Sequence, residues 1–283
     1  MSNKRLRFAT IPLELEFPDE MSADVAGVLA GEYEAGYFGA GLSVVDIGAN
    51  VGSFTIWAHM RWPNSTIHAY EPQPETYATL LRNVGGLPNV HCHDKAVYPD
   101  EASQLDFYSS YAGDGESGLV TYIGETFEDV APERIVQVPV LHPRHLPACD
   151  ILKIDVEGGE ARILESMNLS GVSLILLEYQ NLANHAAIQS RLSGEFVCEF
   201  EDRHPWSEIL PKSGYRRDLV GDAYGRLFFF NKRLNRLHRP VGLELMARSS
   251  WSVEPHMLSL RQLLRVLPSA TARALGNRLK GLF

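Results

Sequence analysis

The fold is constrained most by an alternation that begins at residue 43, where short runs rich in aliphatic and β-branched residues alternate with segments of helical character. Residues 74–83 and 161–167 are two of the expected helices. Strands that alternate with helices at this spacing are typical of a mainly parallel sheet. We therefore predict an α/β, doubly wound, Rossmann-like fold with a seven-stranded, mostly parallel sheet and helices on both faces. The predicted strands are residues 43–47, 67–70, 90–93, 151–154, 174–177, 196–200 and 227–230.

Three regions are predicted along the chain. Residues 1–40 form an N-terminal helical lead-in with a helix near residues 21–33, residues 41–232 form the sheet domain, and residues 233–283 form a basic amphipathic helical tail. Residues 100–147 interrupt the alternation, because short strand-like runs are separated there by Gly, Pro and Asp. We expect this segment to be an insertion, antiparallel and lying over one edge of the sheet.

Composition excludes several classes of protein. A chain of 283 residues with 45% hydrophobic and 22% charged residues can bury a substantial core, which excludes disorder as its main state. Apolar runs are far shorter than the roughly 20 residues that cross a bilayer, and the N-terminus lacks the apolar stretch of a secretory signal. A cytoplasmic location is therefore expected. Cys92, Cys149 and Cys198 form no CxxC pair and are expected as buried thiols.

The net charge of −9 is distributed unevenly. Residues 232–283 carry ten Lys and Arg against two Glu, so the preceding 231 residues have a net charge of −17 and would repel a phosphate backbone. Nucleic acid is therefore not expected as a partner. Leucines at helical spacing in the tail, flanked by Arg and Lys, predict two basic amphipathic helices. These would dock on the acidic body, join a second subunit in a homo-oligomer, or attach peripherally to the inner membrane face.

Three successive predicted strands are followed by residues suited to an adenosine ligand. In open α/β sheets, ligands bind beyond the carboxyl ends of the strands. Gly48 and Gly52 allow a tight turn after the first strand, and the next helix N-terminus can receive a carboxylate. Glu71 follows Gly48 by 23 residues, a spacing that suits an acid binding ribose hydroxyls, and Asp94 would accept from an adenine amino group. Each residue alone also fits an ordinary turn, so the prediction rests on their combination.

The loop favours S-adenosyl-L-methionine over a dinucleotide. Asn50 stands where dinucleotide-binding loops carry their second glycine, and Asp46 adds negative charge beside the loop. That charge disfavours a diphosphate and suits a ligand with an ammonium and a sulfonium group. The chain also lacks a GKS or GKT phosphate loop. S-adenosyl-L-methionine is therefore the expected cofactor, with NAD a distant alternative.

Four segments resemble FkbM-type methyltransferases, a branch of the class I enzymes that use S-adenosyl-L-methionine. They are residues 44–55 (VVDIGANVGSFT), 70–72 (YEP), 94–97 (DKAV) and, most distinctively, 152–160 (LKIDVEGGE), with 32–34 and 177–179 also similar. The resemblance covers roughly residues 30–232 and departs at Gly159, where alanine is expected. It implies methyl transfer to a hydroxyl of a sugar or glycoconjugate, or alternatively to a polyketide-type natural product or an amine. By this match the cofactor would be held by Asp46, Gly48, Asn50, Gly52, Glu71 and Asp94.

Methyl transfer to a hydroxyl needs a group that accepts the hydroxyl proton, besides alignment of the reacting atoms. Asp155 is the first choice as base or base-orienting residue, because it closes the fourth strand beside the expected methyl. Glu157 and Glu178 are second choices, with ordinary alternatives as a helix cap and as the partner of a cation. Lys153, within a buried strand, is expected as a paired structural cation.

Other interpretations stay open at this stage. Asp155, Glu178 and Asn181 could offer oxygen ligands to magnesium, but they form no local motif, and no metal ligand is assigned. A non-catalytic sensor of S-adenosyl-L-methionine, acting through its tail, is a different class of function. Several loop residues could border the acceptor site: His142, His145, His185, His204 and Trp206.

Overall fold

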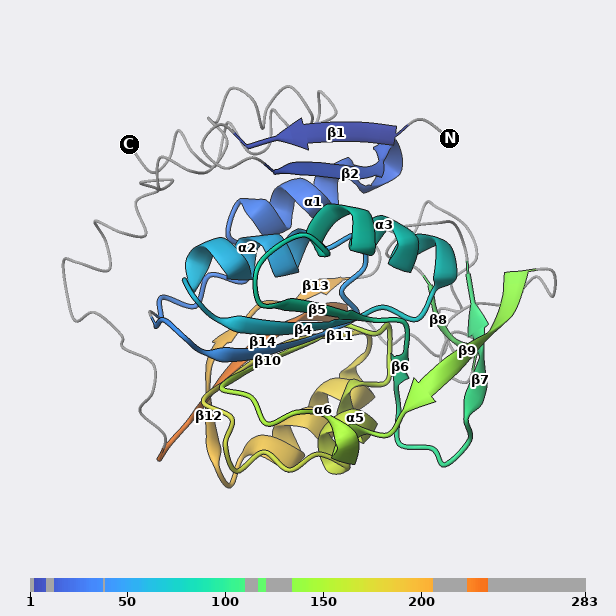
Figure 1. Ribbon diagram of the computed structural model, residues 1–283. Coiled ribbons are helices and arrows are strands. Elements are labelled where there is room, and N and C mark those ends of the chain that lie inside the picture. The colour runs from blue at the N-terminus through green and yellow to red at the C-terminus, as the bar shows by residue number, and fades with distance from the viewer. Residues whose placement is uncertain are drawn as a thin grey trace.

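The computed structural model describes residues 3–8, 13–37, 39–109, 117–120, 134–205 and 223–233 (Figure 1). The predicted tail, apart from Arg233, and Trp206 lie outside these ranges, so the predictions made for them remain predictions. No helix in the described ranges is both long and apolar enough to span a membrane.

A central sheet of seven strands in the described part of the chain confirms the predicted fold class. Its order is β12 (Phe196–Glu201), β14 (Ala223–Asn231), β11 (Leu174–Tyr179), β10 (Ile151–Ile154), β3 (Ser43–Ile47), β4 (Thr66–Tyr70) and β5 (Val90–His93). Neighbouring strands are parallel except at β14, which runs antiparallel to β11 and β12 and also pairs with β13 (His204–Pro205). Strand order reverses between β3 and β10, so their carboxyl ends border the crevice where such sheets bind ligands.

Helices cover both faces of the sheet (Figure 1). The helices α1 (Ser22–Leu29), α2 (Ser53–Arg61) and α3 (Pro74–Val84) pack on one face, and α5 (Glu160–Glu165) and α6 (Leu182–Leu192) pack on the other. Successive strand residues alternate between two cores: Val44 lies with α1 and α2, whereas Val45 lies with α5 and α6. All four residues of β10 are buried, as expected for a central strand of a parallel sheet.

The predicted insertion is a second sheet beyond the β5 edge (Figure 1). It contains β6 (Ala96–Val97), β9 (Ile135–Leu141), β7 (Gln104–Tyr108) and β8 (Gly118–Leu119), in that order. The pairs β7–β9 and β7–β8 are antiparallel, as predicted, whereas β6 pairs with β9 in parallel. A short 3-10 helix, η3 (Pro143–His145), leads from this sheet towards β10. The insertion therefore flanks the carboxyl ends of the central strands.

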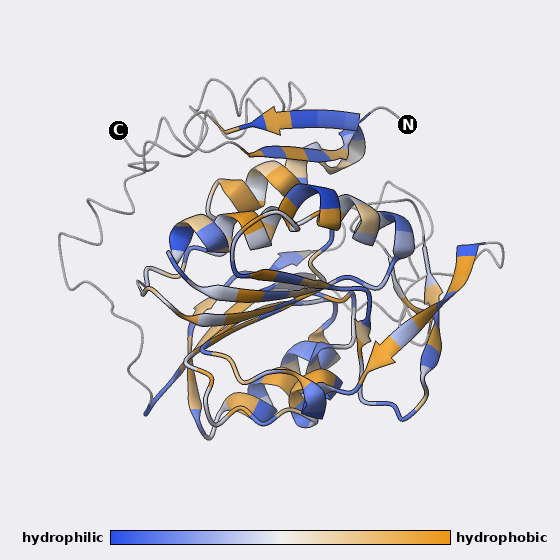
Figure 2. Ribbon diagram, in the orientation of Figure 1, coloured by the Kyte–Doolittle hydropathy of each residue, from blue (hydrophilic) through white to orange (hydrophobic). Residues whose placement is uncertain are grey.

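The lead-in contains a β-hairpin that the sequence analysis does not predict. Antiparallel strands β1 (Asn3–Arg7) and β2 (Glu14–Pro18) precede η1 (Asp19–Met21) and α1. Its residues alternate: Leu6, Leu15 and Phe17 are buried, while the charged residues between them point outward. In Figure 2, β1 is accordingly mostly hydrophilic and α1 mostly hydrophobic. The predicted helix at 21–33 is correct in place but ends at Leu29.

The cysteines are less uniform than predicted. Cys149 is buried, but Cys92 and Cys198 are only half-buried, and all three are free. Burial raises the pKa of the Cys149 thiol to about 12, with Asp150 contributing to the rise. The prediction of a buried thiol is therefore right for Cys149 alone.

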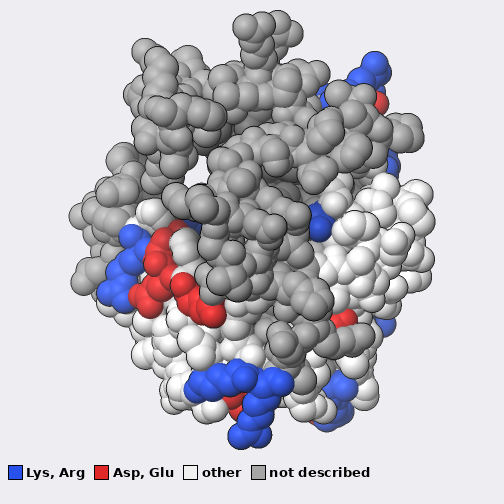
Figure 3. Space-filling view, turned by 90° about the vertical axis from the view of Figure 1, so that its left-hand side faces the viewer, with Lys and Arg blue, Asp and Glu red and all other residues white. Residues whose placement is uncertain are grey.

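Charged side chains of both signs meet on the surface. Figure 3 shows one face, on which the largest group of Asp and Glu lies directly beside Lys and Arg. Ion pairs of this kind include Arg203–Glu201 at 3.1 Å and Arg144–Glu101 at 2.8 Å, whose side chains are largely exposed. Such exposed pairs add little stability, so the fold depends mainly on its buried contacts.

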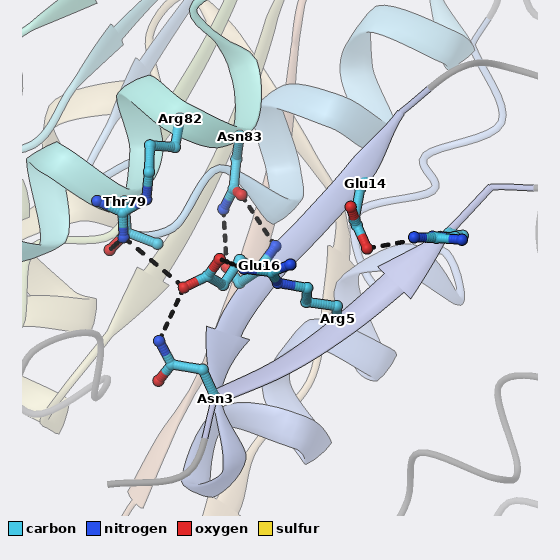
Figure 4. A network of polar contacts seen from close by, with 8 residues as sticks. Asn3, Arg5, Glu14, Glu16, Thr79, Arg82 and Asn83 are labelled. Carbon is cyan, nitrogen blue, oxygen red and sulfur yellow. Dashed lines mark hydrogen bonds and ion pairs between the residues drawn. The ribbon is translucent and has the colours of Figure 1, made fainter.

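A buried amide joins the hairpin to the rest of the domain (Figure 4). Asn83 of α3 accepts a hydrogen bond from the Glu16 N–H at 2.9 Å and donates to the Glu16 carbonyl at 2.8 Å. The same Nδ2 donates to the Val51 carbonyl at 2.7 Å, in the loop after β3. Asn83 therefore fixes β2 against α3 and the loop together, because all three backbone groups depend on it.

We expect Asn83→Ala to lower the free energy of unfolding by about 2 to 4 kcal/mol, since it leaves polar backbone groups without partners. Asn3→Ala is the matched control, because Asn3 bonds Glu16 from an exposed position, at 2.8 Å. That control should change stability by less than about 0.5 kcal/mol. Denaturant unfolding of both variants is the measurement, and equal losses would contradict the role of Asn83.

Candidate active site

A cavity lies at the carboxyl ends of β3, β4 and β10, beside the insertion sheet. Its lining combines polar groups at the strand ends with apolar side chains of the insertion. The lining residues are Ile47, Gly48, Asn50, Tyr70, Glu71, Pro72, Gln73, Thr76, Lys95, Ala96, Val97, Tyr98, Phe107, Ser117, Leu119, Asp155, Val156, Glu157, Gly159 and Ile163.

The loop after β3 has an unusual backbone. Gly48, Asn50 and Gly52 have φ angles of 77°, 49° and 94°, in the left-handed region, and Gly52 is the N-cap of α2. The Gly48 N–H donates to the Tyr70 carbonyl at 3.0 Å, which ties the loop to the end of β4. A Cβ at Gly48 would lie only 1.8 Å from the Asp155 carbonyl oxygen. Only glycine therefore fits at this position.

Glu71 places a buried carboxylate in the cavity wall, with 6% of its surface exposed. Its Oε2 accepts from the Asn50 N–H at 3.0 Å, and its Oε1 accepts from the Gln73 N–H at 2.9 Å. Burial raises the pKa of Glu71 to about 7, although these hydrogen bonds and Lys153 oppose the rise. The position and chemistry of Glu71 fit the predicted role of binding two ribose hydroxyls.

Asp46 lies beneath the loop and does not line the cavity. It is fully buried, with Thr55 Oγ1 donating to its Oδ2 at 2.7 Å and Lys153 Nζ lying 3.4 Å from its Oδ1. Lys153 also donates to the Gly48 carbonyl at 2.6 Å. Lys153 is thus the paired structural cation that the sequence predicts, and Asp46 supports the loop through it.

Asp155 follows β10 and reaches the cavity, with 27% of its side chain exposed. Its backbone N–H donates to the Ile47 carbonyl at 3.1 Å, which extends the pairing of β10 with β3 by one residue. Its Oδ2 lies 3.4 Å from Lys153 Nζ and accepts from the Tyr33 hydroxyl at 3.4 Å. A carboxylate is therefore held at the strand end predicted for the base.

Glu157 also lines the cavity and has a φ of 60°. This conformation costs a residue with a side chain roughly 1–2 kcal/mol, and such residues gather at functional sites. The loop before the next helix is held by Glu160, whose Oε1 accepts from the N–H groups of Val156 at 3.2 Å and Gly158 at 3.0 Å.

Glu178 is the last residue but one of β11, the parallel neighbour of β10, and is paired in register with Arg226 of β14. Burial, Asp155 and Glu32 raise the pKa of Glu178 well above its usual value, while Arg226 and Lys153 oppose the rise. Glu178 is not among the residues that line the cavity. It lies instead in a cluster of charged groups next to Asp155.

The structure brings only some of the predicted site residues together. Of the nine, Asp46, Gly52, Asp94 and Glu178 are absent from the described lining of the cavity, which contains Gly48, Asn50, Glu71, Asp155 and Glu157. Asp94 is exposed at the end of β5, whereas the next residues, Lys95 and Ala96, line the cavity.

Among the loop histidines, His142 caps η3 by accepting from the Arg144 N–H, and His204 lies 3.5 Å from Asp202. His185 packs against Tyr179, with ring centroids 4.9 Å apart. Each of these histidines therefore makes an ordinary structural contact.

Sequence reasoning missed lining residues contributed by turns and by the insertion. Gln73 accepts from the Thr76 N–H as the N-cap of α3, and its Nε2 donates to Ser109 Oγ at 2.8 Å. Its position directly before Pro74 is a signal for a cap that could have been used. Tyr98 and Phe107 carry no such local signal, because they reach the cavity only through the pairing of the insertion strands.

The described part of the chain gives no support to the ligand set considered for magnesium. The Asn181 side chain is the N-cap of α6 and accepts from the Asn184 N–H at 2.8 Å. In the ranges that the structure describes, no group of three or more His, Cys, Asp or Glu side chains is arranged to hold a metal ion. The amide oxygen of Asn181, the third ligand that the sequence suggested, is engaged as a helix cap.

Comparison of the sequence with known proteins gives three findings. A family model described as "Methyltransferase FkbM domain" matches residues 46–216. The chain is 28% identical over 149 residues to 31-O-demethyl-FK506 methyltransferase FkbM of Streptomyces tacrolimicus, covering 43% of this chain and 57% of that protein. It is 23% identical over 136 residues to hexuronic acid methyltransferase AglP of Haloferax volcanii, covering 47% and 54%. The chain therefore spans a little over half the length of these curated relatives.

Among solved structures, M. jannaschii TYW2 in complex with AdoMet aligns with 81% of this chain and 86% of that chain, at 10% identity and a TM-score of 0.42.

We expect Gly48→Ala to lower the free energy of unfolding by more than about 2 kcal/mol, because the new methyl group meets a backbone carbonyl and the φ is positive. Gly194→Ala is the control, since a Cβ there would meet no atom within 4 Å. That change should stay within about 0.5 kcal/mol. Thermal or denaturant unfolding compares the two, and a Gly48 variant as stable as the control would contradict the close approach of the loop to Asp155.

Proposed function

Because the chain belongs to the FkbM methyltransferase family, we propose that it transfers the methyl group of S-adenosyl-L-methionine to a hydroxyl group of a sugar or glycoconjugate. The observation that carries the proposal is the meeting of three strand ends at one cavity. The glycine loop after β3, Glu71 after β4 and Asp155 after β10 all line it. This arrangement combines a turn for a small cofactor, an acid for ribose and a base in one place.

The cofactor would be held mainly by the loop and by Glu71. Gly48, Asn50 and Gly52 shape the loop, and α2 begins directly after it, so its N-terminus suits the carboxylate of the amino-acid part. Glu71 would accept the ribose hydroxyls. Apolar side chains of the insertion, including Val97, Phe107 and Leu119, offer a surface for the flat base. Asp94 keeps its predicted role as acceptor for the adenine amino group, although it lies outside the described lining.

The chain itself would contribute a proton acceptor and would hold the reacting atoms in line. When bound, S-adenosyl-L-methionine supplies a methyl carbon that takes the electron pair of the acceptor oxygen while the carbon–sulfur pair returns to sulfur. Asp155 would take the hydroxyl proton as this bond forms. Glu157 and Glu178 are the second choices for that role. Burial and the neighbouring Asp155 raise the pKa of Glu178, so Glu178 holds a proton more readily than an ordinary glutamate. We therefore expect Glu178 and Asp155 to share one proton instead of both carrying a negative charge.

The acceptor class is the least constrained part of the proposal. AglP is named for a hexuronic acid, which supports a sugar acceptor, whereas FkbM is named for 31-O-demethyl-FK506. A polyketide-type or amine acceptor is therefore the alternative. A non-catalytic sensor is disfavoured by the carboxylate of Asp155 at the cavity, which cofactor binding alone would not need.

The proposal also covers the cellular location of the protein and the role of its basic tail, residues 233–283. We keep the predicted cytoplasmic location, with peripheral membrane contact or self-association through the basic tail. Lipid-linked acceptors would suit such a tail. Co-sedimentation with anionic vesicles, with and without residues 256–283, separates membrane contact from docking on the body.

The test is calorimetric titration with S-adenosylhomocysteine, with NAD as the control ligand and Glu71→Gln as the variant. Ribose hydroxyls favour the ionised carboxylate, so binding near pH 7 should release about half a proton, measured in buffers of different ionisation enthalpy. Affinity should rise from pH 6 to pH 8 as Glu71 ionises, and the variant should bind more weakly, without proton release or this pH dependence. Transfer from labelled S-adenosyl-L-methionine to neutral glycosides and hexuronates then identifies the acceptor.

Two results would contradict the proposal. Equal affinity of the wild type and Glu71→Gln for S-adenosylhomocysteine would show that Glu71 does not bind the ribose. Absence of binding to the wild-type protein, or preference for NAD, would require another ligand for the cavity.

A further inference from the structure

We infer that Tyr33, in the lead-in, is a positioning residue of the active site: with Lys153 it holds Oδ2 of Asp155, so that Oδ1 is left to face the reacting groups. This inference rests on the proposed function. Tyr33 lies outside residues 46–216, the segment that the family model matches, but within residues 32–34, which resemble the family. The lead-in would therefore complete the active site and not merely extend the domain.

Tyr33 is built as a rigid hydrogen-bond donor. Its side chain is 2% exposed, and its ring packs edge-on against Phe54 at 5.2 Å and stacks with Phe228 at 6.4 Å. Burial, Asp155, Glu178 and Glu32 raise the pKa of Tyr33 well above its usual value, against the effect of Arg226. The phenol therefore stays neutral and donates a hydrogen bond to Asp155 Oδ2, at 3.4 Å.

Ion pairs on both sides fix the turn that carries Tyr33. Before it, Glu32 Oε1 lies 2.6 Å from Arg226 Nη1, and the same Nη1 donates to the Glu32 carbonyl at 3.4 Å. Arg226 Nε in turn donates to Asp202 Oδ2 at 3.0 Å. After it, Glu34 accepts two hydrogen bonds from Arg61 of α2, at 2.6 and 2.9 Å. The turn is thus clamped to β14 and to α2 at once.

The two oxygens of Asp155 have different surroundings. Lys153 Nζ and the Tyr33 hydroxyl both approach Oδ2, each at 3.4 Å. In the part of the chain that the structure describes, Oδ1 has no hydrogen-bond partner, and the side chain of Asp155 lines the cavity. Two donors on one oxygen fix the plane of the carboxylate. Tyr33 itself is too deeply buried to reach a substrate, so it acts through Asp155.

Two cofactor analogues test this without a known acceptor. S-adenosylhomocysteine lacks the methyl group, whereas sinefungin carries an amine on a carbon in place of the methyl sulfonium. The amine is charged and would be bound by Asp155, so the ratio of the two dissociation constants reports how well that carboxylate is placed. Tyr33→Phe keeps the ring and removes only the hydroxyl. Tyr37→Phe is the matched control, since Tyr37 lies in the same lead-in and its hydroxyl donates to Glu199 at 3.3 Å.

We expect Asp155→Asn to weaken sinefungin about tenfold or more, and Tyr33→Phe to weaken it about fivefold, with the affinity for S-adenosylhomocysteine unchanged in both. Tyr37→Phe should leave both affinities as in the wild type. Once an acceptor is found, Tyr33→Phe should lower kcat with the KM for S-adenosyl-L-methionine unchanged.

Three outcomes would overturn the inference while leaving the proposed function intact. In the first, Tyr33→Phe keeps the wild-type ratio of the two dissociation constants. In the second, it weakens the binding of both analogues equally, as the loss of a merely structural residue would. In the third, Tyr33→Phe changes the ratio but Asp155→Asn does not. If neither analogue binds the wild-type protein, the proposed function itself fails.

Discussion

The site depends on one buried ammonium group. Lys153, in the middle strand β10, donates to the Gly48 carbonyl at 2.6 Å and lies 3.4 Å from both Asp46 and Asp155. Burial disfavours its charge, but the carboxylates of Asp155, Asp46 and Glu178 outweigh that effect and raise the pKa of Lys153. A buried charge of this kind is tolerated only when it is paired and hydrogen-bonded. The same cation therefore joins the cofactor loop, the strand below it and the candidate base.

Other features of the site follow from that junction. The loop after β3 can approach the Asp155 backbone closely because Gly48 has no side chain. Two residues later, the Asn50 N–H donates a hydrogen bond to Glu71. Asn50 and Glu157, which both line the cavity, have positive φ angles. Backbone strain of this kind persists only where surrounding contacts enforce it, and it is common at functional sites. The fold thus uses buried polar contacts to hold a strained, preorganised crevice.

The sequence predicts local features well and long-range ones poorly. The strand at 43–47 and the acidic residues at the strand ends follow from hydrophobic runs and spacing, and the structure places Glu71 and Asp155 at one cavity as expected. The burial of Asp46 could also have been predicted, because it alternates with Val45 and Ile47 and must point to the opposite face.

The contribution of Tyr33 could not be predicted from local pattern. Its hydroxyl contacts a residue 122 positions away, and nothing near Tyr33 indicates that partner. The hairpin was missed because half of the residues in its strands are charged, which hides their alternation of buried and exposed positions. The exposed position of Asp94, with Lys95 and Ala96 in the cavity wall, depends on how the chain leaves β5 for the insertion. Spacing along the sequence carries no information about that turn.

The most direct test of this account is the thermal unfolding of Lys153→Met, measured with and without S-adenosylhomocysteine. The substitution keeps a long unbranched side chain but leaves Asp46 buried without its cation, so the free energy of unfolding should fall by about 3 kcal/mol or more. The loop should also lose its anchor, so that S-adenosylhomocysteine raises the midpoint of the wild type but not of the variant. A variant as stable as the wild type, with the same shift on adding S-adenosylhomocysteine, would contradict the central role of Lys153.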